Sequence, residues 1–385
     1  MQELELHFEH NIKIKETSHL QKIQYAFEKL LFVPEKALKP KIIHELMSYL
    51  KQKLENLKYP LKVFITKVGR LITGIVVCQI DPEYKSYGRK CGTFGWLYAL
   101  DIESCQLLME ACEQFLKLHK IRKIRGPINY PKLIGGIGFQ TKGFNKKMMS
   151  GVNYHTSDMR ELRFLEELGY KKESKYSCVK VIKSTWEKGN SLDTSIKIEF
   201  KNLTGFKSHI EDMKRLAEAS FYSILADAPG GDERLKGMVK LFSLIPNTFF
   251  QLPEDFNPKD HSNFPLFMDA LSCFSSKNEL PFVPIAFDRQ SGELVGIIIS
   301  LPNLYQIWKG EPLTDANVDT VIINNHYTGR GIFSALTTVG IIGVKIHNVS
   351  YYEGTTIWSN NEKAINTIFP HSKVVREHIV VQKRI

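Results

Sequence analysis

Two glycines with the spacing G-x-G, Gly329 and Gly331, lie between two apolar stretches in the last quarter of the chain. The stretch 318–323 is typical of a strand, and the apolar residues after Gly331 recur at helical spacing. A loop at such a junction surrounds one point with free backbone N–H groups and the positive end of a helix dipole, which is how proteins hold phosphate. Glycines lack Cβ atoms, so this loop can curl tightly and approach a ligand closely. The segment is therefore predicted to bind phosphate, and a simple tight turn is the alternative.

The elements that position this loop occur in two copies. β-Branched residues flank a turn at Gly69 within 63–80, and they flank a turn at Ser291 and Gly292 within 283–301. Both segments are predicted to be β-hairpins. A strand, a helix and a strand follow each hairpin, and each half closes with a helix and a last strand. The predicted strands are 4–9, 93–100, 121–129, 177–182, 196–200, 318–323, 354–358 and 374–385, and the predicted helices are 107–118, 159–168, 333–339 and 361–369.

The length of 385 residues exceeds one ordinary hydrophobic core, so two domains are expected. Residues 183–195 are polar and have no clear period, which places the join there. The predicted domains cover 1–188 and 189–385, and both are of the α/β class with a mixed sheet.

The composition limits the classes of function. Hydrophobic residues make up 43% and charged residues 24% of the chain, which indicates a globular protein and not a fibrous or disordered one. No apolar run is long enough to span a bilayer, and the first residues are charged, so we expect a cytoplasmic protein without membrane contact. The six cysteines form no pair or His/Cys group with zinc-ligand spacing, so we expect buried thiols and no metal.

The formal net charge is +11, but the cations are spread along the chain. Their densest group, within 117–125, is expected to be a solvated helix end and loop, and attraction for an anionic ligand is the alternative. No RNA-binding motif is visible, so nucleic acid is not the expected partner.

The order of elements, with a phosphate loop after the fourth strand, resembles the GNAT superfamily of acyl-CoA-dependent N-acyltransferases. The cofactor signature of that family is Q/R-x-x-G-x-G/A. Its six positions are occupied here by His326, Tyr327, Thr328, Gly329, Arg330 and Gly331. A histidine stands where Gln or Arg is usual. The motifs Gly126-Pro127-Ile128-Asn129 and Asn153-Tyr154-His155 of the first half resemble those of bacterial GNAT-like proteins.

The resemblance implies two tandem GNAT-like domains and acetyl-CoA, or another acyl-CoA, as the cofactor. The first half has no glycine where it needs a phosphate loop, and Asp101 and Glu103 stand at the helix start. We therefore expect a degenerate first copy and a cofactor in the second. The implied cofactor-binding residues are Ile322, Ile323, Asn324, His326, Gly329, Arg330, Gly331, Ile332, Asn360 and Asn361. For the last two, an N-cap role is the alternative.

The resemblance also implies transfer of an acyl group to a small-molecule or peptide amine. The tyrosine that the family uses as an acid is missing from the last helix, where Ile368 or Phe369 stands. Tyr327 and His371 are candidate replacements, and Glu353 is the candidate base. A packing role is the alternative for each.

The acceptor pocket is expected between the halves. Its candidate residues are Asn129, Tyr130, Asn153 and Tyr154. The glycine-dense stretch 126–147 is too irregular for a regular element, and a flexible loop over the cleft is one interpretation. The alternative function is a catalytically inactive GNAT-fold protein that binds an acidic ligand or RNA.

Overall fold

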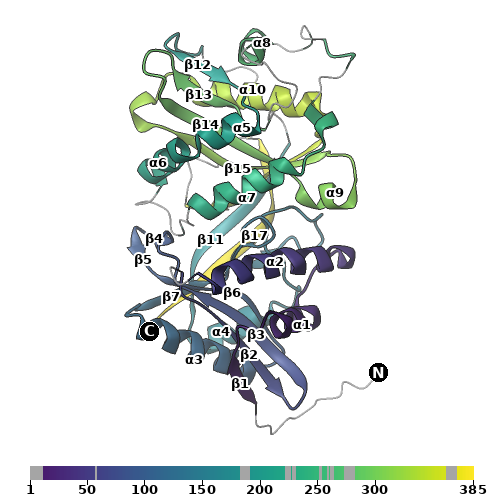
Figure 1. Cartoon of the computed structure of the whole chain (residues 1–385), viewed down its shortest axis with the longest axis vertical. Coiled ribbons are helices and arrows are strands. Elements are labelled where there is room, and N and C mark those ends of the chain that lie inside the picture. Colours follow the sequence, from purple (N-terminus) through teal and green to yellow (C-terminus); the bar gives the residue numbers. More distant parts are fainter. Residues whose placement is uncertain are drawn as a thin grey trace.

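One mixed sheet runs through the whole computed structural model (Figure 1). The structure describes residues 12–56, 59–182, 191–221, 227, 231–250, 254–257, 260, 264–272, 282–360 and 371–385. In sheet order the strands are β1 (Lys13–Glu16), β2 (Leu61–Val68), β3 (Leu71–Gln79), β6 (Gly92–Ala99), β7 (Lys123–Gly126), β17 (Ser372–Arg384), β11 (Lys171–Val181), β16 (Tyr351–Trp358), β15 (Asp315–Ile323), β14 (Leu294–Pro302), β13 (Ile285–Asp288) and β12 (Ile196–Glu199). An additional strand, β10 (Phe139–Lys142), pairs with β17.

Helices cover both faces of this sheet. The first half contains α1 (Leu20–Leu30), α2 (Lys39–Leu54), α3 (Ile102–Leu118) and α4 (Arg160–Glu167). The second contains α5 (Leu203–Ser208), α6 (Ile210–Phe221), α7 (Gly231–Ser243), α8 (Phe264–Ser272), α9 (Leu304–Lys309) and α10 (Ile332–Ile346). Two short ribbons, β4 (Lys85–Ser86) with β5 (Arg89–Lys90) and β8 (Ile128–Asn129) with β9 (Gly136–Ile137), lie outside the large sheet. The α/β class with a mixed sheet is confirmed.

Strand alternation explains the layers. In β2, Val63 and Ile65 belong to the core that contains α1 and α2, whereas Phe64 between them packs with the residues of α3. In β14, Ile297 belongs to the first of these cores and Ile298 packs with α10. Successive side chains of a strand point to opposite faces, so strands that are apolar throughout must be covered on both sides.

Most predicted elements are present. Both hairpins form, with positive φ at Gly69 and Gly292, and the predicted strand–helix–strand units appear as β6–α3–β7 and β15–α10–β16. Asp101 caps α3 by accepting a hydrogen bond from the Ser104 backbone N–H at 2.6 Å. The predicted strand 4–9 and helix 361–369 lie outside the described residues, and the first described strand is β1.

The halves exchange their last strands. β11 ends the first half but pairs with β16, where Lys180 lies opposite Glu353. β17 ends the second half but pairs with β7, where Val381 lies opposite Gly126. β11 and β17 also pair with each other, antiparallel along their length. Each half therefore completes the sheet of the other, and the boundary proposed at residue 188 divides the sequence without dividing the sheet.

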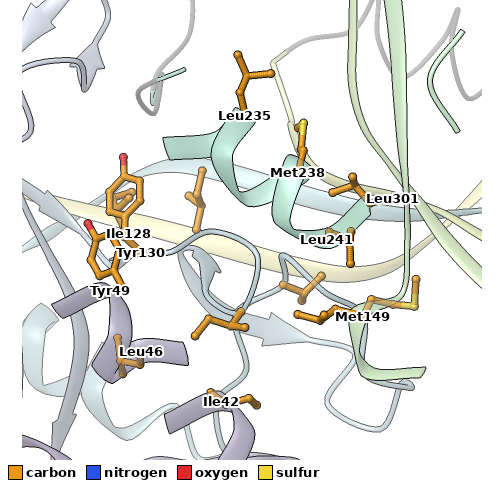
Figure 2. Close-up of a cluster of buried hydrophobic side chains, with 14 of the residues drawn as sticks. Ile42, Leu46, Tyr49, Ile128, Tyr130, Met149, Leu235, Met238, Leu241 and Leu301 are labelled. Carbon is orange, nitrogen blue, oxygen red and sulfur yellow. The ribbon is translucent and has the colours of Figure 1, made fainter. Parts of the chain in front are cut away.

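A hydrophobic core also joins the halves. Figure 2 shows side chains of α2, including Ile42 and Leu46, on one side of this core and side chains of α7, including Leu235 and Met238, on the other. Met149, from the chain between β10 and α4, lies between the two helices (Figure 2). All of these residues belong to one buried cluster.

The glycine-dense segment 126–147 is not the flexible loop that its composition suggested. It contains β8, β9 and β10 and is largely buried. A Cβ atom at Gly135 would lie 2.2 Å from the Asn129 carbonyl oxygen, and one at Gly143 would lie 2.1 Å from the Val375 carbonyl oxygen. The glycines permit close packing of backbone on backbone, so this prediction was wrong.

The described cysteines fit the expectation of buried thiols. Cys78, Cys91, Cys105, Cys112 and Cys178 are buried and free, and Cys273 lies outside the described residues. No described helix is long and apolar enough to cross a bilayer. No group of three potential metal ligands occurs among the described residues.

Two buried histidines make the stability of this fold depend on pH. Burial lowers the pKa of His155 to about 3 and that of His378 to about 4. The His378 Nε2–H donates to the Asn153 carbonyl oxygen at 2.9 Å, and the Gln140 backbone N–H donates to His155 Nδ1 at 3.3 Å. Both rings are therefore neutral in the folded state over a range in which the unfolded chain binds protons.

We expect the free energy of unfolding to fall by roughly 2 kcal/mol per histidine between pH 7 and pH 5. The folded pKa values lie below the value of about 6.5 for an exposed histidine. The contribution of each neutral histidine to the free energy of unfolding is therefore fully present above about pH 6.5 and is lost on acidification. Urea unfolding at several pH values measures the slope. His378→Gln should reduce this slope by the contribution of one bound proton. His326→Gln, at an exposed residue, should leave the slope unchanged. Equal slopes in the parent and His378→Gln would contradict this account.

Candidate functional site

The parallel strands β15 and β16 separate part-way along their length. They pair from Asp315 opposite Tyr351 to Val318 opposite Gly354, after which β15 continues to Ile323 with only β14 as a described neighbour. The separation leaves a gap on one side of β15 whose backbone groups face no described strand.

Two local irregularities accompany this separation. Asp319 is the extra residue of a β-bulge in β15, because Ser300 pairs with Val318 and Ile299 with Thr320. A bulge bends its strand and increases the local twist. In β16, Thr356 has a φ of 50°, and its backbone N–H lies 3.5 Å from Cys178 Sγ on β11. β16 therefore leaves β15 to follow β11.

The predicted phosphate loop follows β15 at the open end of this gap. Asn324 begins it: its backbone N–H donates to the Val295 carbonyl at 2.8 Å, and its Oδ1 accepts from the His326 N–H at 3.0 Å. The Arg330 carbonyl accepts from the Asp193 N–H at 3.1 Å. Both ends of the loop are thus fixed, while His326 and Gly329 are exposed.

The backbone N–H groups of residues 329–334 have no hydrogen-bond acceptor within the part of the chain that the structure describes. They include the first turn of α10, where Gly331 is the N-cap with a φ of 75° and supplies no side chain. Helix N-termini leave such donors unsatisfied and carry a partial positive charge. The segment can therefore accept an anion from solvent.

The two glycines of this loop have different surroundings. A Cβ atom at Gly329 would meet nothing within 4 Å, although its φ is 86°. A Cβ atom at Gly331 would lie 2.5 Å from the Ser191 carbonyl oxygen. Packing within the protein alone therefore explains Gly331, whereas the open space beside Gly329 is available to a ligand.

Carboxylates near the loop oppose an anion. Glu293, in the β13–β14 hairpin, accepts hydrogen bonds from Asn324 Nδ2 at 3.1 Å and from the Tyr327 hydroxyl at 3.3 Å. The Arg330 guanidinium lies 4.8 Å from the centre of the Tyr327 ring. Partial desolvation and the Glu293 carboxylate raise the pKa of Tyr327, so its hydroxyl stays protonated at neutral pH.

The structure does not bring the three predicted catalytic residues together. Glu353 is fully buried, forms an ion pair with Arg376 and accepts a hydrogen bond from the Tyr351 hydroxyl at 2.6 Å. His371 is exposed, and its carbonyl accepts from the Ile182 N–H at 2.9 Å. It lies beside the start of β16, whereas Tyr327 follows the end of the parallel neighbour β15, so the two lie at opposite ends of these strands.

Asn360 follows β16 at the same end as the phosphate loop, and it is exposed. The ends of two neighbouring parallel strands meet at one edge of a sheet, so Asn360 and the loop share that edge. Asn361 lies outside the described residues. Of the remaining predicted cofactor residues, Ile322 and Ile332 are buried, and Ile323 is half-buried.

The first half has a corresponding gap, and its own chain fills it. β6 pairs with β7 only at Gly92 and Thr93 and bulges at Trp96, which has a φ of 50°. The Trp96 backbone N–H donates to Asn129 Oδ1 at 2.7 Å, and its indole N–H donates to the Tyr130 carbonyl at 2.7 Å. A Cβ atom at Gly95 would lie 2.3 Å from the Ile128 carbonyl oxygen. This gap has no room for a ligand.

The four predicted acceptor residues are all buried. Asn129 Nδ2 donates to Asn153 Oδ1 at 2.8 Å, and Asn153 Nδ2 donates to the Gly138 carbonyl at 2.8 Å. The Tyr154 hydroxyl donates to the Met149 carbonyl at 3.2 Å, and the Tyr130 ring stacks on Tyr49. The cavity beside Asn153 and Tyr154 has a volume of only about 20 Å³, which is space for a water molecule and not for a substrate.

Comparison with solved structures decides the fold. The structure is similar to that of a tandem GNAT protein from the clavulanic acid biosynthesis pathway. The TM-score is 0.53 at 7% identity, and the match covers 97% of this chain and 98% of that one. The chain has a tandem GNAT fold. A probable N-acyltransferase from Enterococcus faecalis matches with a TM-score of 0.54 at 10% identity, over 97% of this chain and 73% of that one.

A GCN5-related glucosamine N-acetyltransferase region of a fungal multi-domain GH3 β-N-acetylglucosaminidase is also similar. Its TM-score is 0.55 at 11% identity, over 97% of this chain and 38% of that one. No family model and no curated protein matches this sequence. At these identities the likeness shows the tandem GNAT fold alone.

Sequence reasoning missed an ion pair at the gap of the second half. Lys132 Nζ lies 2.9 Å from Asp319 Oδ1, and their side chains are 13% and 4% exposed. The pair joins a loop of the first half to the β15 bulge at which the strands separate. An aspartate inside the predicted strand 318–323 was the available signal, because an isolated carboxylate is rarely buried without a partner.

We expect Asn129→Ala to lower the free energy of unfolding by roughly 1–3 kcal/mol, because it leaves the buried N–H of Trp96 without an acceptor. Urea unfolding measures this quantity. Asn360→Ala, at an exposed site, is the matched variant and should leave the free energy of unfolding unchanged within about 0.5 kcal/mol. Unchanged stability in Asn129→Ala would contradict its structural role.

Proposed function

We propose that this protein is an acyl-CoA-dependent N-acyltransferase whose cofactor binds to the second half. The acceptor is a primary amine of a small molecule or peptide, and acetyl-CoA is the proposed donor. The observation that carries the proposal is the set of N–H groups at 329–334 that have no acceptor among the described residues, placed beside the gap between β15 and β16. The GNAT folds of the solved structures support it.

The residues of this loop fit a diphosphate better than the corresponding residues of the first half. The N-terminus of α10 carries no side-chain cap, whereas Asp101 occupies the N-terminus of α3 with its carboxylate. Gly329 leaves open space for a phosphate group, and Arg330 supplies a cation. Glu293 weakens the attraction but does not occupy the donors.

In this proposal the protein's own groups orient the reactants. Acyl-CoA, when bound, would supply the acyl group as a reactive thioester. The backbone N–H groups on the gap side of β15 would polarise its carbonyl, as an oxyanion hole does. Tyr327 is the proposed proton donor to the leaving thiolate of coenzyme A, because its hydroxyl stays protonated at neutral pH. The proton that the amine loses passes to solvent water. Glu353 and His371 are left out: the first is enclosed in an ion pair, and the second lies at the other end of the strands.

Acetyl-CoA is expected to raise the melting temperature of the parent protein, and Gly329→Asp is expected to abolish that rise, because a carboxylate at this position repels phosphate. Gly329 is a better choice than Gly331, where any side chain would collide with Ser191. The matched control is Gly310→Asp, because Gly310 has a φ of 69° and equally open space. Thermal unfolding monitored by circular dichroism measures the shift.

Two results of this experiment would contradict the proposal. No shift with any acyl-CoA in the parent protein would end it, and an equal loss of the shift in both variants would assign the effect to backbone strain. Sustained thiol release with a panel of amines would exclude the alternative of a non-catalytic binding protein, which predicts a shift without turnover.

Tyr327→Phe should lower kcat at least tenfold while the acetyl-CoA shift in melting temperature stays the same, because the ring remains and only the proton donor is removed. Steady-state thiol release measures kcat, and Tyr87→Phe, at an exposed tyrosine of the other half, is the control. Equal kcat in the parent and Tyr327→Phe would remove Tyr327 from the mechanism and leave cofactor binding untouched.

A further inference from the structure

A pocket in the first half lies far from the proposed cofactor site. It has a volume of about 390 Å³ and opens between the first turns of α1 and the tip of the β2–β3 hairpin. This volume is typical of sites for small molecules. From β3 to β15 the sheet crosses six strand intervals, which is roughly 30 Å. The pocket is therefore independent of the loop at 324–331.

The charges around this pocket have one sign. Its lining contains Lys15, Lys22, Lys67 and Arg70 and no aspartate or glutamate. None of these four cations forms an ion pair within the described residues, whereas Lys62, which lies on β2 like Lys67, pairs with Glu16. Uncompensated charge of one sign in a concave site concentrates ions of the other sign there.

The sheet register places a further cation at the same edge. Lys13 lies directly opposite Lys67 in the antiparallel pair of β1 and β2. Like charges that face each other across two strands destabilise the pair. The fold therefore holds these cations together at a cost in stability, and a bound anion would offset that cost.

Besides Thr17, Gln21 and Gly69, the rest of the lining is apolar. Ile65 and Ile72 contribute aliphatic surface, and the ring of Tyr25 is 47% exposed beside the cations. Aliphatic and aromatic surface of this kind suits an apolar body, while the cations suit a phosphate or carboxylate group. A bare inorganic anion would use only half of these contacts.

We propose that this pocket is a second binding site, for a ligand that carries a phosphate group on an apolar body. The four cations hold the phosphate, and Tyr25, Ile65 and Ile72 contact the body. A free metabolite and the headgroup of a phospholipid share this chemistry. The site does not depend on the proposed acyl transfer, because none of its residues belongs to the second half.

The test uses the full chain and 1-naphthyl phosphate, whose fluorescence reports binding. The expected dissociation constant is at least tenfold lower than those of 1-naphthol and of inorganic phosphate, each of which has only one part of the recognised chemistry. Lys67→Glu combined with Arg70→Glu should raise it at least tenfold. Arg89→Glu combined with Lys90→Glu changes the net charge equally at exposed residues outside the pocket, and it should change the constant less than twofold.

Lys22→Gln, a milder change on the surface of α1, should weaken binding by a smaller factor and keeps the test valid if the double variant does not fold. Equal losses in both double variants, or no preference for the naphthyl phosphate, would overturn the proposal. Sedimentation with phosphatidylcholine vesicles, with and without phosphatidic acid, identifies the source of the ligand. If the protein binds to vesicles with phosphatidic acid and 1-naphthyl phosphate displaces it, the ligand is a lipid. If the variant with Lys67→Glu and Arg70→Glu still binds to these vesicles, the proposal is contradicted.

Discussion

The antiparallel pairing of β11 with β17 is the interaction on which the rest of the structure depends. Each strand ends one half of the chain and pairs with a strand of the other half, so neither sheet is complete alone. The exchange also explains the gap at the candidate site. β16 pairs with β11 as far as Trp358, opposite Tyr176, but with β15 only as far as Gly354. A strand that must follow β11 has to leave β15, and the gap opens where the two separate.

The two halves use the same gap in opposite ways. In the first half, the Asn129 carboxamide oxygen accepts a hydrogen bond from the backbone N–H of Trp96, and Asp101 caps the following helix. In the second half, β15 beyond Val318 faces no described strand on the side of β16, and Gly331 caps α10 without a side chain. One copy has thus satisfied its donors internally, while the other leaves the N–H groups of 329–334 without an acceptor among the described residues, and we propose that an anion binds to them. A duplicated fold can divide its roles in this way because stability and binding draw on the same backbone groups.

Local patterns were sufficient to predict much of this structure. The hairpins around Gly69 and Gly292, the cap at Asp101 and the loop at Gly329 follow from periodicity and turn chemistry. Contacts between residues far apart in the sequence were not predictable from one chain. Arg125 was expected on a solvated surface, but it is fully buried, with Nε and Nη2 each 2.9 Å from the Asp227 carboxylate. The strand exchange and the burial of the 126–147 segment failed for the same reason, since composition does not reveal what packs against a segment.

Hydrogen–deuterium exchange with and without coenzyme A is the most direct test of where the cofactor binds. The backbone N–H groups at 329–334 have no acceptor within the described residues, so they should exchange rapidly in the free protein and slowly in the presence of coenzyme A. Peptides that cover 92–106, where Asn129 and Asp101 already occupy the donors, should not change. Protection of 92–106 instead, or protection of neither segment at saturating coenzyme A, would contradict the assignment of the cofactor to the second half.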